Sequence, residues 1–166
     1  MNALSYEQFI AAKRRKHAAA GFGVSESRPW LMDFQRALVA KTVERGRCAL
    51  FASTGLGKTR MQLAWADEVA RHTGGRVLIL APLAVAQQTE REAHSLGLAR
   101  VKSCRTAAQM DGAHIVVTNY ERLHHFDVRD FAGVVLDESS CIKDFSARTT
   151  GQLTEAFSNH RFRLCA

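Results

Sequence analysis

The sequence predicts an α/β fold in which a mostly parallel sheet is covered by helices on both faces. From residue 31 onward, short apolar runs rich in branched residues alternate with longer segments of helical spacing. Continuous apolar runs are typical of parallel strands, because these are buried on both faces and connected through helices. The 166 residues, 46% of them hydrophobic, suffice for one domain with a substantial core.

Residues 1–28 are expected to form a basic amphipathic helix followed by a linker. A capping box, Ser5-x-x-Gln8, opens the segment 1–20, which carries a basic run at residues 13–16. The glycines, serines and proline of residues 21–29 predict a linker. Five basic and two acidic residues in the first 30 supply +3 of the net charge of +7. Contact with nucleic acid, a solvated basic face and a partner-binding tail all remain open for this arm.

Residues 29–166 are expected to form the domain proper. Helical spacing is found in residues 31–43, 59–72, 85–96 and 147–157. Strands are predicted at residues 48–52, 77–81, 115–118, 134–136 and 162–166. Asp67 and Glu68 lie within the second helix, at no strand end, and are expected on its surface.

The sharpest local signal is the segment 52–59, Ala-Ser-Thr-Gly-Leu-Gly-Lys-Thr, called the P-loop below. It follows an apolar run and opens a helix, which is the setting that a phosphate-binding loop requires. Lys58 is expected to reach the β and γ phosphates and Thr59 to ligate Mg²⁺, while the backbone N–H groups cradle the phosphates. The predicted nucleotide-binding residues of this loop are Thr54, Gly55, Leu56, Gly57, Lys58 and Thr59. The alternative is a glycine-rich turn that contains Lys and Thr by chance.

An acidic pair follows the predicted strand 134–136. A P-loop needs an acidic partner at the end of a neighbouring strand, which holds Mg²⁺ and positions the attacking water. Asp137 is therefore predicted to bind Mg²⁺ and Glu138 to be the general base, so Glu138 and Lys58 are the expected catalytic residues. The bland alternative is a solvated acidic pair.

These segments resemble motifs of helicase superfamily 2. Residues 55–59, Gly-Leu-Gly-Lys-Thr, and 137–140, Asp-Glu-Ser-Ser, look like motifs I and II, and residues 141–144 resemble the follow-on of the Swi/Snf-like branch. The likeness also extends to DEAD/DEAH-box helicases of phages. It implies a RecA-like P-loop NTPase fold, specifically the first of two such lobes. Asp-Glu-Ser-Ser departs from the usual Asp-Glu-Ala-His or Asp-Glu-Ala-Asp.

Three weaker matches occur in the expected order. Residues 31–35 resemble the segment whose glutamine binds adenine, which implies that Gln35 reads the base. Residues 81–83 with Gln87 resemble motif Ia, and residues 118–121 resemble motif Ib. Both motifs hold the nucleic-acid backbone in that family, which implies contacts from Pro82, Gln87, Thr118, Asn119 and Tyr120. Alternatively, Pro82 only ends a strand and Tyr120 is a core residue.

The resemblance implies the ATP-binding lobe of an ATP-dependent DNA helicase or translocase. ATP and Mg²⁺ are the implied cofactors, and nucleic acid, DNA rather than RNA, is the implied partner. The chain is expected to end before motif III, and the second RecA-like lobe, which carries the arginine fingers, would act in cis or in trans. Very low turnover is therefore expected of these 166 residues alone. The alternatives are a stand-alone ATP-binding regulatory module and an unrelated P-loop enzyme such as a nucleotide kinase.

Composition narrows the class further. A net charge of +7 with a pI near 9.7 favours polyanionic partners, although a basic protein without such a partner fits equally well. No apolar run approaches the roughly 18 to 20 residues that a bilayer requires, and no signal peptide is recognisable. A cytoplasmic protein without membrane contact is expected. The four scattered cysteines form no C-x-x-C pair, which indicates reduced, mostly buried residues.

Two further features favour structural roles. Adjacent histidines such as His124 and His125 are expected to point in different directions, and no third metal ligand is near them in the sequence. Trp30 could stack on a base, but packing against the first helix of the domain is the commoner use.

Overall fold

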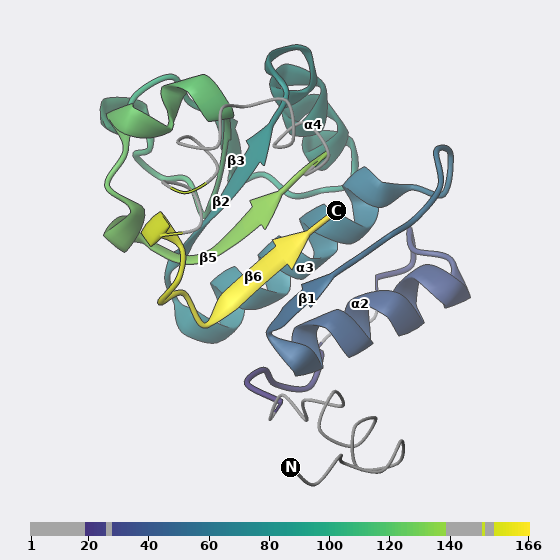
Figure 1. Cartoon of the computed structure of the whole chain (residues 1–166). Helices are drawn as coiled ribbons and strands as arrows, with labels where there is room; N and C mark the ends of the chain where they lie inside the picture. The colour runs from purple at the N-terminus through teal and green to yellow at the C-terminus, as the bar shows by residue number, and fades with distance from the viewer. Residues whose placement is uncertain (1–18, 26–27, 139–150, 152–154) are drawn as a thin grey trace, which may run out of the picture.

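The computed structural model describes residues 19–25, 28–138, 151 and 155–166. A six-stranded sheet forms its centre, with the order β1-β6-β5-β2-β4-β3 and every neighbouring pair parallel (Figure 1). The strands are β1 (Arg47–Ala49), β2 (Arg76–Ala81), β3 (Val101–Ser103), β4 (Ile115–Asn119), β5 (Phe131–Leu136) and β6 (Phe162–Cys165). The predicted α/β class with a parallel sheet is confirmed. The sequence does not predict β3, because the strand has three residues and only Val101 among them is apolar.

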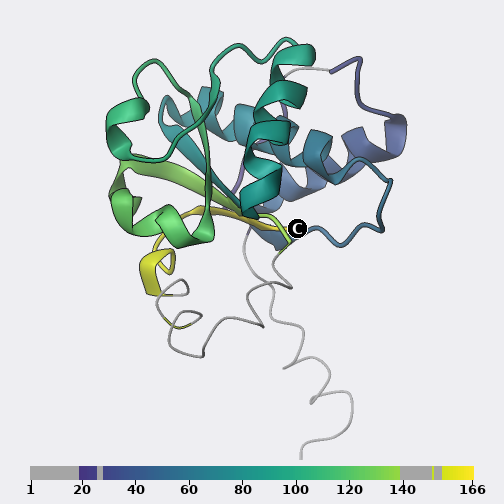
Figure 2. The same cartoon turned by 90° about the horizontal axis from the view of Figure 1, so that it is seen from above.

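In the described residues, the α-helices α2, α3 and α4 cover one face of the sheet, and short 3₁₀ helices and turns lie on the other (Figures 1 and 2). The helices are α2 (Asp33–Arg45), α3 (Lys58–Thr73), α4 (Leu83–Ser95), η1 (Ala107–Gln109), η2 (Tyr120–His125) and η3 (Val128–Asp130). Side chains of β2 alternate between the two cores, with Ile79 on the side of the α-helices and Leu80 on the other. Of the predicted helix 147–157, residues 151, 155 and 156 are described and helical.

The central helix α3 is buried along most of its length. All of its residues from Met61 to Ala70 are buried, since it lies against the sheet and also contacts α2 and α4. The prediction that Asp67 and Glu68 lie on the surface is therefore wrong: they are 9% and 0% exposed. A buried carboxylate needs a charged partner, and that partner lies about 40 positions away in the sequence.

Arg28 is the partner of both carboxylates. Its guanidinium donates to Asp67 at 2.5 Å and also to Glu68. The backbone N–H and the hydroxyl of Ser25 donate to the other oxygen of Glu68 at 3.2 and 3.0 Å. Burial alone would raise the pKa of Glu68, but the hydrogen bonds from Arg28 and Ser25 outweigh it and lower the pKa. Glu68 is thus held as a carboxylate inside the domain.

Residues 19–25 and 28, called the N-terminal strap below, pack on the domain. The N–H of Gly21 donates to the carbonyl of Glu44 at 3.0 Å, and a Cβ at Gly21 would lie 1.7 Å from the Val43 carbonyl oxygen. The ring of Phe22 stacks on His72 with 3.7 Å between centroids. The described part of the segment 21–29, predicted as a linker, is irregular backbone that packs on the domain. The predicted helix at 1–20 lies almost entirely outside the described residues.

Candidate nucleotide-binding site and adjoining pocket

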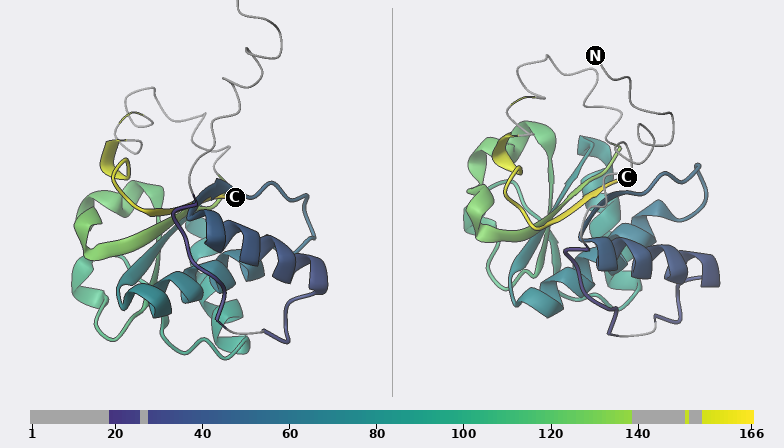
Figure 3. Two further views of the ribbon diagram at one scale, coloured as in Figure 1. Left: turned by 90° about the horizontal axis from the view of Figure 1, so that it is seen from below. Right: turned by 60° about the horizontal axis from the view of Figure 1, so that its bottom comes forward.

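A cavity of about 560 Å³ lies at the carboxyl ends of β1 and β6. It is called the nucleotide cavity below. Because β6 lies between β1 and β5, the chain end at Ala166 is flanked by the loop after β1 and the turn after β5 (Figure 3). The lining residues are Leu50, Phe51, Ala52, Ser53, Lys58, Glu138 and Ala166. The sheet order thus brings together Lys58 and Glu138, which are 80 positions apart in the sequence.

The P-loop turns tightly into α3. Gly55 and Gly57 have left-handed backbone angles, with φ of 83° and 74°, which only glycine adopts without strain. The N–H of Leu56 donates to the carbonyl of Ser53 at 3.3 Å, and Gly57 caps the helix that begins at Lys58. The N-terminus of this 16-residue helix therefore opens at the rim of the cavity. A helix N-terminus with a lysine on its first residue attracts anions.

Asp137 is buried, with 6% exposure, just beyond the end of β5. The amide Nε2 of Gln62 donates to its Oδ1 at 2.6 Å, and the N–H of Glu138 donates to the same oxygen at 3.0 Å. Burial raises the pKa of Asp137, whereas these two hydrogen bonds and the charge of Lys58 oppose that rise. Because water hardly screens this buried carboxylate, it would attract a nearby cation strongly.

Glu138 is exposed and has a φ of 46°, the one positive φ of a non-glycine residue in the described part of the chain. This conformation costs roughly 1–2 kcal/mol in a residue with a Cβ. The hydroxyl of Tyr120 donates to the main-chain carbonyl of Asp137 at 2.7 Å, directly before the strained residue. The turn that presents Glu138 to the cavity is thus stabilised by a side chain of another segment, Tyr120 of η2.

The oxygen atoms of this site suit Mg²⁺ better than a softer metal. Within the described residues no group of three His, Cys, Asp or Glu side chains is placed to hold a metal ion. The predicted ligands Thr59 and Asp137 offer a hydroxyl and a carboxylate. Mg²⁺ commonly takes one or two such protein oxygens and completes its shell with phosphates and water.

Gln35, predicted to read adenine, lies beside the P-loop with 3% exposure. Its Nε2 donates to the carbonyl of Leu56 at 2.9 Å, and its Oε1 accepts from the N–H of Met32 at 2.9 Å. A Cβ at Gly57 would lie 2.5 Å from the same Nε2. In this structure the amide therefore joins the backbone of Met32 to that of the P-loop.

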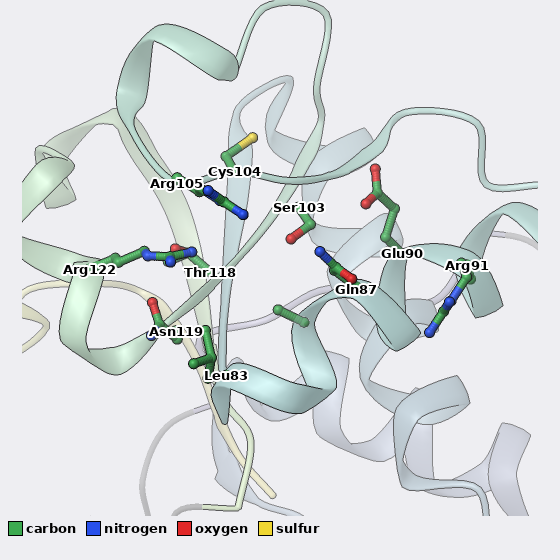
Figure 4. Close-up of a pocket in the computed structure, with 11 residues that line it drawn as sticks. Leu83, Gln87, Glu90, Arg91, Ser103, Cys104, Arg105, Thr118, Asn119 and Arg122 are labelled. Atoms are coloured by element: carbon green, nitrogen blue, oxygen red, sulfur yellow. The ribbon is translucent and has the colours of Figure 1, made fainter.

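A second pocket, of about 300 Å³, lies between α4 and the carboxyl ends of β3 and β4 (Figure 4). We call it the α4–β4 pocket. Three of the residues predicted to contact nucleic acid, Gln87, Thr118 and Asn119, line it. Of the others, Pro82 caps α4 and Tyr120 opens η2, and neither is a lining residue. The complete lining is Leu83, Ala86, Gln87, Glu90, Arg91, Ser103, Cys104, Arg105, Thr118, Asn119 and Arg122.

Several polar atoms on the β4 side of this pocket lack hydrogen-bond partners among the described residues. Thr118 and Asn119 are 1% and 4% exposed, and the hydroxyl of Thr118 and the Oδ1 of Asn119 have no hydrogen-bond partner. Within the described residues, the guanidinium groups of Arg105 and Arg122 make no hydrogen bond or ion pair. Figure 4 places these four side chains on one side of the pocket, opposite Gln87 and Glu90 of α4. A buried hydroxyl and two unpaired cations are suited to an anionic ligand.

Sequence reasoning missed Arg105, Arg122 and Gln62. Arg122 directly follows the recognised segment 118–121, and a basic residue at that place was an available signal. Arg105 follows β3, a strand too short to predict. Gln62 lies on α3 among apolar neighbours, where only the fold identifies its partner.

The remaining sequence expectations have mixed outcomes. The rings of His124 and His125 lie 3.9 Å apart on exposed η2, so the prediction that they diverge is wrong. Trp30 is partly buried and packs against the hydrophobic core to which α2 contributes Val39 and Val43. The described cysteines, Cys48, Cys104 and Cys165, are free and half-buried or buried, and burial raises the pKa of Cys48 to about 11. A helix long and apolar enough to span a bilayer is not found in the described residues.

Comparisons with known proteins agree with this architecture. Residues 32–163 match the family model of the DEAD/DEAH box helicases. No curated protein sequence gave a significant match. Among solved structures, the UvsW helicase from bacteriophage T4 superposes with a TM-score of 0.70 and 17% identity, covering 99% of this chain and 60% of that one.

Two archaeal structures are similar as well. The Sulfolobus solfataricus SWI2/SNF2 ATPase core in complex with dsDNA has a TM-score of 0.65 and 19% identity, covering 87% of this chain and 34% of that one. A hypothetical ATP-dependent RNA helicase from Sulfolobus tokodaii has a TM-score of 0.63 and 18% identity, covering 82% and 46%. The chain thus spans 60% of that UvsW chain and less than half of the two archaeal chains. At these identities the likeness establishes the RecA-like fold.

Proposed function

We propose, since the chain belongs to the DEAD/DEAH box helicase family, that it is the ATP-binding lobe of a DNA helicase or translocase. The observation that carries the proposal is the meeting of Lys58 and Glu138 at one cavity, with Asp137 buried directly before Glu138. A phosphate-binding loop and an acidic pair at the same edge of a parallel sheet are the two parts that ATP hydrolysis requires in P-loop proteins. A stand-alone ATP-binding module would have the same cavity but no nucleic-acid-dependent turnover.

Each residue of the nucleotide cavity has a defined task in this proposal. The N–H groups of the P-loop and the amino group of Lys58 bind the β and γ phosphates. Thr59 and Asp137 hold Mg²⁺, which when bound neutralises charge on the phosphate oxygens. Glu138 orients the attacking water and accepts its proton. Gln35 reads adenine with the hydrogen-bonding capacity of its amide that the bonds to Leu56 and Met32 leave free.

The α4–β4 pocket is proposed to bind the nucleic-acid backbone. It lies at the same edge of the sheet as the nucleotide cavity, because both are built at the carboxyl ends of parallel strands. Arg105 and Arg122 would pair with a phosphate, and the hydroxyl of Thr118 would donate to it. Glu90 lies on the opposite wall and would keep the strand on the β4 side. Pro82 and Tyr120 would flank the contact.

DNA is proposed as the polymer on the resemblance of residues 141–144 to the Swi/Snf-like branch. The neighbours differ on this point: one is described in complex with dsDNA and another as an RNA helicase. A second RecA-like lobe, in cis or in trans, is the proposed partner that completes the ATPase.

Binding of nucleic acid is expected to depend steeply on salt and on the two pocket arginines. Each lost phosphate contact removes about one unit from the slope of log affinity against log salt. Arg105→Ala and Arg122→Ala should each weaken binding of a labelled DNA oligonucleotide and flatten its decline between roughly 50 and 200 mM salt. Fluorescence anisotropy measures both quantities.

Arg100→Ala is the matched control, because Arg100 and Arg105 flank β3 at opposite ends. It removes the same charge but lies outside the α4–β4 pocket. If Arg100→Ala and Arg105→Ala lose the same amount of DNA affinity, the effect comes from net charge and not from the α4–β4 pocket. A DNA affinity that does not change with salt concentration would rule out the phosphate contact. An RNA oligonucleotide of the same sequence tests the choice of polymer.

A further inference from the structure

Gln62 is a polar side chain in a helix segment that is otherwise used for packing. It is 1% exposed and lies one turn after Lys58 and Thr59 on α3. Burying an amide is unfavourable unless it is hydrogen-bonded, and an apolar side chain of similar volume would fill the same space. The bond from Nε2 to Asp137 Oδ1, at 2.6 Å, gives this amide a specific role.

The hydrogen bonds at Asp137 distinguish its two carboxylate oxygens. The amide of Gln62 and the N–H of Glu138 both donate to Oδ1. Within the described residues, Oδ2 accepts no hydrogen bond. The carboxylate is thus anchored through one oxygen, and its rotation about the Cβ–Cγ bond is fixed.

The anchor comes from the helix that also carries the P-loop end. Gln62 is rigidly related to Lys58 and Thr59, since all three lie within five residues of one helix. Asp137 belongs to the segment after β5 on a different part of the sheet. The bond therefore sets the position of the Asp137 carboxylate relative to the phosphate-binding loop itself.

We infer that Gln62 is a positioning residue that presents Oδ2 of Asp137 to the Mg²⁺ ion bound with the nucleotide. The inference rests on the proposed function of the cavity and adds a residue outside the recognised motifs. Groups that hydrogen-bond a metal ligand fix its orientation, and their loss typically costs about 10- to 100-fold in metal affinity or activity.

Gln62→Met tests the inference, because it keeps the length of the side chain and removes the donor. Binding of a fluorescent ATP analogue is measured in EDTA and over a Mg²⁺ titration. Affinity without Mg²⁺ should stay within about twofold, while the Mg²⁺ concentration for half-maximal enhancement should rise about tenfold or more. Gln62→Leu repeats the test if Gln62→Met melts at a much lower temperature.

Thr89→Val is the control for loss of a buried hydrogen bond. Thr89 is 2% exposed and donates to the carbonyl of Val85 within α4, so its loss should leave the Mg²⁺ titration unchanged. In an Asp137→Asn background, Gln62→Met should add no further Mg²⁺ effect, because the two residues act through one contact. A purely structural role would instead lower binding with and without Mg²⁺ alike.

The outcomes separate the inference from the proposed function. An unchanged Mg²⁺ requirement in Gln62→Met, or additive effects with Asp137→Asn, overturns the positioning role alone. Failure of the wild-type chain to bind the nucleotide under any condition overturns the proposed function and the inference together.

Discussion

Lys58→Ala is expected to remove most of the binding of Mg-ATP, with an affinity loss of about 30-fold or more. Truncating one partner of a hydrogen-bonded charge pair costs roughly 2–5 kcal/mol, and every 1.4 kcal/mol is about tenfold in affinity. Lys58 is the lysine that lines the nucleotide cavity, and no other cation among the described lining residues replaces it. Isothermal titration calorimetry measures the change directly.

Arg60→Ala provides the comparison within the same helix. Arg60 lies two positions after Lys58, but its guanidinium pairs with Glu92 of α4 at 3.3 Å and does not line the cavity. Its loss should change ATP affinity by less than about twofold, because exposed ion pairs contribute little. Equal affinities for the wild type and Lys58→Ala would mean that this loop is a turn and no phosphate site.

The second large effect concerns turnover: these 166 residues are expected to bind ATP and hydrolyse it very slowly. An arginine supplied from outside the phosphate loop typically contributes about 10³ to 10⁵ in rate, which corresponds to about 4–7 kcal/mol of barrier. Among the described residues that line the nucleotide cavity, none is an arginine. Arg28 is committed to Asp67 and Glu68, and Arg60 to Glu92.

Glu138→Gln should abolish the residual turnover while ATP affinity stays near that of the wild type. The change keeps the size of the side chain but removes the base that orients the water. Phosphate release from radiolabelled ATP measures the rate, and Glu44→Gln, an exposed residue of α2, is the control. Several turnovers per second without a partner would show that an arginine reaches the γ phosphate within this chain or through self-association.

Local sequence signals were sufficient to locate the two segments of the site that are each formed by one short stretch of chain, the P-loop and the acidic pair. The P-loop combines two glycines, a lysine and the start of a helix within eight residues, so its turn could be predicted from spacing alone. Asp137 and Glu138 could be placed at a strand end because they follow a recognisable apolar strand. Their meeting with the P-loop follows from the general rule that parallel strands end at one edge of the sheet.

Contacts between distant segments could not be predicted in the same way. Asp67 and Glu68 looked like surface residues, because nothing near them in the sequence indicates the buried cation, Arg28, that they pair with. Arg105 was missed because β3 has three residues and a single buried one. The sequence gives no sign of a special role for Gln62, because its partner Asp137 comes close only when α3 packs against β5.

The N-terminal strap has a consequence for grafting this lobe onto other proteins. The family match begins at residue 32, so a chimaera joined there would discard Ser25 and Arg28. Glu68, at 0% exposure, would then face neither a cation nor the Ser25 hydroxyl inside the transplanted domain. A junction placed before Ala19 keeps the whole strap with α3, including the bond of 2.5 Å that Arg161 donates to the Ala20 carbonyl. The segment to transplant from this chain therefore begins at least 13 residues before the family match, which starts at residue 32.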